Sequence, residues 1–140
     1  MEVSDIRRRL RGAIEEAKRR SAERRTRIDQ ASREYEQFLS SIAVPAMHTI
    51  AQALIAEGHR FKVLTPGQAV RLAAEFSPDD YLEIALDTDG DVPAVMLHTS
   101  RGRGRRSVTR ERPLGRNIGE LTDERVVTVL LEELIPFIQR

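Results

Sequence analysis

The feature that most constrains this chain is a long segment without helix-breaking residues. From Val3 to Ile42 there is no proline and a single glycine, Gly12, and residues of high helix propensity dominate. We expect one helix of about 40 residues, which at about 1.5 Å per residue is about 60 Å long. A compact chain of 140 residues has a radius of gyration of only about 14 Å. Part of the helix should therefore project from the folded body.

The apolar residues of this helix form two stripes with a polar segment between them. The N-terminal stripe consists of Val3, Ile6, Leu10 and Ile14. The C-terminal stripe has the 3, 4, 3, 4 spacing of a coiled-coil seam and consists of Ile28, Ala31, Tyr35, Phe38 and Ile42. We expect the C-terminal stripe to form the interface of a homo-oligomer, a dimer being favoured. The overhanging N-terminal stripe should need a partner helix as well.

Proline and glycine divide the chain after this helix. Pro45 removes a backbone donor, so the helix should kink or restart there. A second helical stretch then carries apolar residues on one face and reaches its C-terminal cap at Gly58. We therefore predict two parts, a long charged helix over residues 1–44 and an α+β domain over residues 45–140.

After Gly58 the apolar residues recur with a period of two, which is typical of strands. Four alternating runs, RFKV, VRLAAEF, YLEIALD and PAVMLHT, are each followed by a turn-forming sequence, namely TPGQ, SPDD, DTDGD and SRGRG. They predict an antiparallel meander of four or five strands. Residues 66–76 also match a helix start, with Thr65 as cap and Pro66 at the first position. The strand is favoured there because the alternation covers four positions.

A last helix is predicted from residue 123 onward. Thr122 is its expected N-cap, and Asp123 and Glu124 lie at the positive end of its dipole. Pro136 should end it. The whole order indicates an α+β fold in which helices cover one face of an antiparallel sheet.

Composition narrows the classes of function. The formal charge of +1 comes from 23 basic and 22 acidic residues, so no overall excess points to nucleic acid or an anionic membrane. There is no cysteine, which excludes disulfides and thiolate chemistry. We find no signal-peptide pattern and no stretch approaching the roughly 18 apolar residues of a membrane span. We expect a cytoplasmic protein that does not contact a membrane.

No motif predicts an active site or a metal site. The three histidines, His48, His59 and His98, are far apart in sequence and lack the spacing of metal ligands. The sequence DTDGD begins like a calcium loop, but Gly90 falls at the fourth position and His98 at the twelfth, where glycine at the sixth and glutamate at the twelfth are needed. We therefore expect no enzyme activity, no cofactor and no metal.

The most unusual local composition is an arginine-rich segment at residues 101–112. Residues 101–116 carry seven arginines and one acid, whereas residues 75–91 carry seven acids and no base. Alternate turns of a meander lie at the same end of the sheet, so Arg101 or Arg103 should pair with Asp79 or Asp80 within the chain. The segment is then a hairpin with a basic edge strand, which discourages pairing with other chains. The alternative is a nucleic-acid site formed by Arg101, Arg103, Arg105 and Arg106.

The sequences GHRFKVLTPGQAVRL, SPDDYLEIALDT, HTSRGRGRR, ERPLG and LTDERVVTVLLEELIPF resemble a group of small uncharacterised bacterial proteins that begin with a charged coiled-coil helix. The resemblance covers nearly the whole chain and implies a bacterial cytoplasmic protein of this layout, with no activity to transfer. We expect a non-enzymatic, homo-oligomeric interaction or structural protein that associates through its long helix. An unidentified protein partner and nucleic acid are less favoured alternatives.

Overall fold

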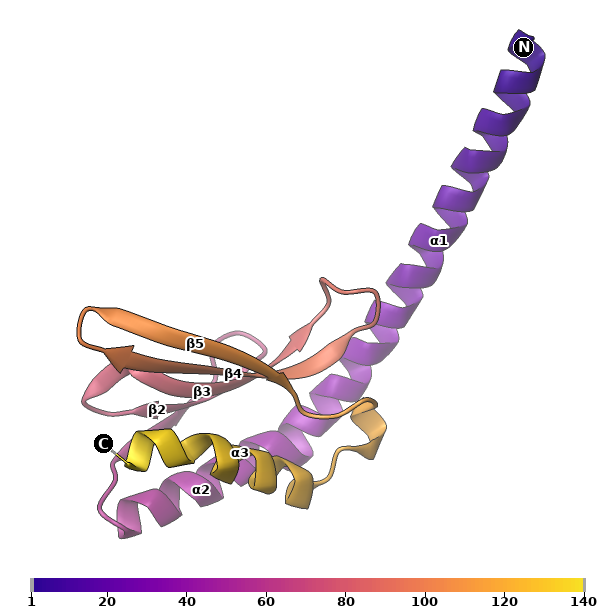
Figure 1. The fold of residues 1–140 in the computed structure, drawn as a ribbon. Helices are drawn as coiled ribbons and strands as arrows, with labels where there is room; N and C mark the ends of the chain where they lie inside the picture. Colours follow the sequence, from indigo (N-terminus) through magenta and orange to yellow (C-terminus); the bar gives the residue numbers. More distant parts are fainter. Residues whose placement is uncertain (1, 140) are drawn as a thin grey trace.

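A computed structural model describes residues 2–139 and shows an α+β fold. In chain order its elements are α1 (Val3–Phe38), η1 (Leu39–Ala43), α2 (Val44–Ala56), β1 (Phe61–Leu64), β2 (Val70–Ala74), β3 (Ser77–Asp87), β4 (Ala94–Arg103), β5 (Arg106–Pro113), η2 (Ile118–Glu120) and α3 (Asp123–Ile138). The five strands form one antiparallel sheet in the order β1-β2-β3-β4-β5, which is the expected meander. Helices α2 and α3 lie side by side under one face of the sheet (Figure 1).

The region 66–76, which the sequence left open between strand and helix, contains a strand and no helix. Residues 70–74 form β2, which pairs with β1 and β3. The predicted turn SPDD is wrong, because β3 already begins at Ser77 and the chain reverses at Glu75 and Phe76. A register shift between Ala73 and Ala74 accommodates this early reversal.

The hydrophobic core lies between the sheet and the helices. Alternate residues of the central strands face it, among them Leu72 on β2, Ile84 on β3 and Leu97 on β4, and all three are fully buried. The helices contribute the opposing layer, including Met47 on α2 and Leu130 on α3. The apolar residues that recur every second position in the strands thus pack against those that recur about every 3.6 positions in the helices, and together they form one core.

The prediction that the C-terminal stripe forms an oligomer interface is wrong for three of its residues. Ala31, Tyr35 and Phe38 are buried, and the two aromatic side chains belong to the chain's own core. Ile28 and Ile42 are half-buried. A 3, 4 spacing shows that one face of a helix is covered, but it does not distinguish a second helix from a sheet of the same chain. Here other segments of the same chain cover it: η2 contacts α1, and the Tyr35 hydroxyl reaches the carbonyl oxygens of Gln68 and Ile84.

The prolines and caps of the helices agree only in part with expectation. Pro45 lies in the first turn of α2, directly after the π-helical segment Leu39–Ala43. The predicted restart does not occur, because the backbone stays helical from Val3 to Ala56 and the chain passes the proline through this π-helical segment. Gly58 has φ +91°, and His59 N donates to Leu54 O at 2.8 Å, which completes the predicted cap.

Thr122 caps α3 by accepting from Arg125 N. Pro136 does not end α3: the helix continues to Ile138, and Phe137 packs against the core beyond the proline.

One helical segment is long and apolar enough to cross a membrane by length and composition, contrary to expectation. It lies within Val3–Ala56, where an 18-residue window has a mean hydropathy of 1.5. Of this window, 39% is buried inside the fold. The uncharged residues 38–56 also supply Phe38, Met47 and Ile50 to the core, which accounts for their apolar character.

Candidate interaction surfaces

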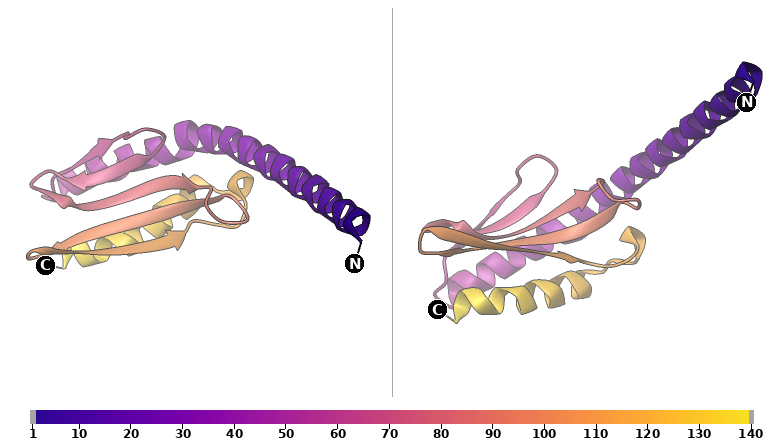
Figure 2. Two further views of the ribbon diagram at one scale, coloured as in Figure 1. Left: turned by 90° about the horizontal axis from the view of Figure 1, so that it is seen from above. Right: turned by 45° about the horizontal axis from the view of Figure 1, so that its top comes forward.

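The N-terminal part of α1 projects from the body as an isolated helix (Figures 1 and 2). We call residues 3–23 the arm. Its N-terminal stripe is open to solvent, with Val3 69%, Ile6 50%, Leu10 57% and Ile14 45% exposed. Just beyond the arm, the Arg24 guanidinium donates to the backbone oxygens of Thr88, at 2.9 Å, and Gly90, at 3.4 Å. These bonds hold the base of the arm against the loop between β3 and β4.

The charges of the arm are divided between its two ends. Near the body, Glu16 binds Arg19 and Arg20, and these hydrogen bonds hold the pKa of its carboxyl below the usual range. Toward the tip, residues 3–14 carry one acid, Asp5, and four arginines, Arg7, Arg8, Arg9 and Arg11. None of these four arginines forms an ion pair with any residue in the range 2–139. The tip of the arm is therefore apolar on one face and basic around it.

A second apolar surface lies where α2 and α3 run side by side (Figures 1 and 2). A groove between the helices is lined mainly by Ile50, Ala53 and Leu54 of α2 and by Leu131, Ile135 and Ile138 of α3. Glu57 and His59 line it near the C-terminal end of α2. The three α3 residues are each about half exposed, at 53%, 50% and 44%. We call this surface the α2/α3 groove.

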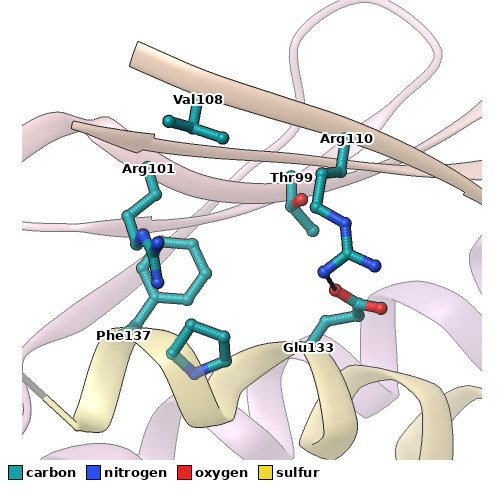
Figure 3. A pocket seen from close by; sticks show the side chains of 7 residues that line it. Thr99, Arg101, Val108, Arg110, Glu133 and Phe137 are labelled. Carbon is teal, nitrogen blue, oxygen red and sulfur yellow. Dashed lines mark ion pairs between the residues drawn. The ribbon is translucent and has the colours of Figure 1, made fainter. Parts of the chain in front are cut away.

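The arginine-rich segment is a β-hairpin, as predicted. Arg103 pairs with Arg106 across a two-residue turn, and Gly104 at its first central position has φ +60°, the conformation that a type II′ turn requires. Arg103, Arg105 and Arg106 are exposed. Arg101 is half-buried and points toward α3 beside Phe137 (Figure 3). The structure therefore does not bring all four predicted arginines to one surface.

The acids of β3 contact this hairpin through its backbone. The Asp80 carboxylate is buried and accepts a hydrogen bond from Gly102 N at 2.8 Å. Asp79 and Asp80 thus lie beside the hairpin, as the meander argument predicted. Among the ion pairs of residues 2–139, however, none joins either acid to Arg101 or Arg103. The predicted ion pair was wrong in its partner, because the backbone amide of Gly102, between the two arginines, donates to the Asp80 carboxylate.

Two acids of α3 that the sequence analysis missed hold the basic edge strand. Arg112 Nη1 lies 2.7 Å from Glu132 Oε2 and 3.3 Å from Glu133 Oε1. Arg110 Nη1 lies 3.8 Å from Glu133 Oε2, and Figure 3 shows this second pair. The hydrogen bond that Arg112 donates to the Glu132 carboxylate is the main cause that raises the pKa of Arg112. Alternation from Val108 would have placed Arg110 and Arg112 on the inner face of β5. The contact with α3 was not visible in sequence.

A small cavity of about 130 Å³ lies between these pairs and the end of the hairpin, lined by Thr99, Arg101, Val108, Arg110, Glu133, Pro136 and Phe137 (Figure 3). Its carboxylate is already bound by arginines of the same chain. The cavity is smaller than the roughly 300 Å³ of ordinary ligand pockets. We therefore interpret this cavity as a packing gap between the edge strand β5 and α3, and not as a ligand site.

The three histidines and the acids of DTDGD lie on separate elements of the fold. The structure places His48 on α2, His59 before β1 and His98 on β4, where His98 Nδ1 lies 3.4 Å from Glu111 Oε1. No group of three or more potential metal ligands occurs among the described residues. The acids of DTDGD form a local turn in which Asp89 N donates to Asp87 Oδ1 at 2.9 Å.

Comparison with family models, curated proteins and solved structures finds no match. The surfaces described above are therefore the basis for assigning a function. Two of them are apolar and open, the N-terminal stripe and the α2/α3 groove, and one is basic and open, the tip of the β4–β5 hairpin.

Proposed function

We propose that this protein is a non-enzymatic interaction protein whose copies associate through the N-terminal stripe of α1. The observation that carries the proposal is the exposure of four apolar side chains in one line on a projecting helix. Isolated apolar residues on a surface are common, but a continuous stripe on a helix without neighbours is typical of a surface that a partner covers.

The arm cannot cover its own stripe. Helix α1 runs without interruption from Val3 to Phe38, and Arg24 holds its base against the loop between β3 and β4. From Leu10 to Arg24 is 14 residues, or about 21 Å of helix. The stripe is therefore held away from the body of its own chain, and only a second molecule can shield it.

The energy of covering the stripe is of the order that association requires. Burying four side chains that are each about half exposed contributes about 3–6 kcal/mol per copy. Association itself costs about 4–15 kcal/mol in lost translational and rotational freedom. A dimer buries two arms, and it also buries the apolar surface that receives each arm. The free energy gained from this burial is comparable with the cost of association.

Sedimentation equilibrium tests the proposal. We expect the full chain to form a dimer at micromolar concentration and Leu10→Lys to weaken the association by at least about tenfold, because a charge would be buried in the interface. Gly12→Lys is the matched control, since it adds the same charge on the opposite face of α1 and should leave the dimer intact. A full chain that remains monomeric would overturn the proposal.

A second candidate function is binding of nucleic-acid phosphates by the β4–β5 hairpin. Arg103, Arg105 and Arg106 are exposed together, and no acid among residues 2–139 forms an ion pair with them. Fluorescence anisotropy with DNA and RNA at low salt should then show binding that is lost when all three become alanine. Replacing Arg7, Arg9 and Arg11 by alanine is the comparison. Binding that depends on these arm residues, and not on the hairpin, would contradict this candidate.

A further inference from the structure

We infer that the α2/α3 groove of one copy receives the N-terminal stripe of a second copy. The inference rests on the proposed self-association through the arm and names the surface that receives it. The stripe and the groove are both apolar, and both are open to solvent in the single chain. Each could therefore cover the exposed apolar side chains of the other. A helix laid into a groove between two helices also completes a three-helix arrangement of the ordinary packing kind.

The groove has the shape that a helix needs. Its lining includes three buried apolar side chains, Ile50, Leu54 and Leu134. Its exposed lining residues are the small Ala53 on α2 and the larger Leu131 and Ile135 on α3. A side chain such as Leu10 can therefore insert opposite Ala53 while its neighbours contact α3. This alternation of small and large residues is how helices interdigitate.

The stripe fits along the exposed face of α3 that continues the groove. From Val3 to Ile14 the stripe covers 11 steps along α1, or about 17 Å. On α3, Leu131, Ile135 and Ile138 line the groove over seven steps, or about 11 Å. Glu124 lies on the same exposed line, seven residues before Leu131, and extends this face to about 21 Å. The stripe is therefore longer than the groove itself and shorter than the α3 face that includes it.

The charges at the ends of the groove complement those of the arm. Glu57 lines the groove near the C-terminal end of α2, and Glu124 extends its α3 face at the other end. Residues 3–14 of the arm carry four arginines and one acid, a net charge of +3. Two arms paired in parallel and in register would instead place these arginines near their own copies, which is unfavourable. Charge therefore favours the groove over a second arm as the receiving surface.

The absence of cysteine from the chain allows a direct test by disulfide trapping. Leu10→Cys chains and mass-tagged Ile135→Cys chains are mixed at micromolar concentration and oxidised. Both side chains are about half exposed, so neither substitution disturbs the core. We expect the mixed disulfide to exceed either homodimer. Arg8→Cys, on the opposite face of α1, is the matched control and should give little mixed product.

A second measurement does not depend on disulfide geometry. Ile135→Lys should weaken the dimer in sedimentation equilibrium by at least about tenfold, as Leu10→Lys does. Gln52→Lys adds the same charge to an exposed position of α2 outside the groove and should have no effect.

The outcomes separate this inference from the proposed function. Leu10→Cys chains that link only to one another, within a stable dimer, would overturn the groove inference and leave self-association standing. A dimer that tolerates Ile135→Lys would overturn it as well. A full chain that stays monomeric would overturn both the groove inference and the proposed self-association. The same holds if the monomer sediments with phosphatidylserine vesicles through its arm, because the stripe would then be covered by lipid.

Discussion

The phenol of Tyr35 donates a hydrogen bond to the backbone carbonyl of Gln68, with 2.6 Å between the two oxygens. The same hydroxyl lies 3.3 Å from the carbonyl oxygen of Ile84 on β3. Tyr35 itself is buried, at 1% exposure. One side chain of α1 therefore ties the helix to the loop before β2 and to the central strand. This is the anchor from which the arm projects.

Tyr35→Phe should remove this anchor while keeping the ring in the core. We expect a loss of about 1 kcal/mol in the free energy of unfolding at neutral pH, because the carbonyl of Gln68 loses its donor. Urea denaturation followed by circular dichroism measures it. A variant as stable as the parent chain would show that water replaces the phenol.

The same tyrosine should make the stability of the fold depend on pH in the alkaline range. Burial, together with the nearby Glu83 carboxylate, raises the pKa of Tyr35 from 10.0 to about 12. The folded chain then holds the proton more tightly than the unfolded chain. The stabilisation is complete below pH 10 and is lost progressively between pH 10 and about 12. The decrease should amount to about 3 kcal/mol, and it should be absent in Tyr35→Phe under the same conditions.

Asp80 and Asp79 should differ sharply although they are adjacent. Asp80→Ala removes a buried carboxylate that accepts from Gly102 N, and we expect a loss of about 1–3 kcal/mol in the free energy of unfolding. Asp79→Ala is the control, because Asp79 is exposed, and its effect should stay within about 0.5 kcal/mol. Equal effects of the two variants in urea denaturation would contradict this assignment.

Glu133 and Glu132 offer a similar comparison on α3. Glu133 is 8% exposed and contacts both Arg110 and Arg112, whereas half of the Glu132 side chain is exposed. Glu133→Gln should lower the free energy of unfolding by about 1–2 kcal/mol, since two guanidinium groups lose a buried charged partner. Glu132→Gln should cost at most about 1 kcal/mol, as exposed pairs do. Thermal unfolding of the two variants side by side tests the order.

Gly104→Ala should strain the hairpin turn. No atom lies within 4 Å of a Cβ at this position, but its φ is +60°, so the cost is one of backbone conformation, about 1–2 kcal/mol. Gly119→Ala also meets no atom within 4 Å, and Gly119 has no positive φ. That control should be neutral or slightly stabilising. A destabilisation of both variants alike would show that space, and not conformation, limits these sites.

The local structure of this chain follows from its sequence. The long helix, the cap at Gly58, the cap at Thr122 and the alternating strands were predictable, because they depend on propensities and periods of residues close together in sequence. The start of β3 at Ser77 was not, since a register shift between neighbouring strands decided it. The projection of the arm from the body was also predictable from the length of the helix.

Only the tertiary structure decided which surfaces are covered. The heptad spacing of Ala31, Tyr35 and Phe38 indicated an apolar face, and the fold covers that face with other segments of the same chain instead of a second chain. Arg110 and Arg112 of β5 are held by Glu132 and Glu133 of α3, 20 or more residues away, a contact that no sequence pattern indicated. A periodic pattern specifies which face of an element is buried, whereas the partner of that face depends on contacts between segments distant in sequence, which no local pattern encodes.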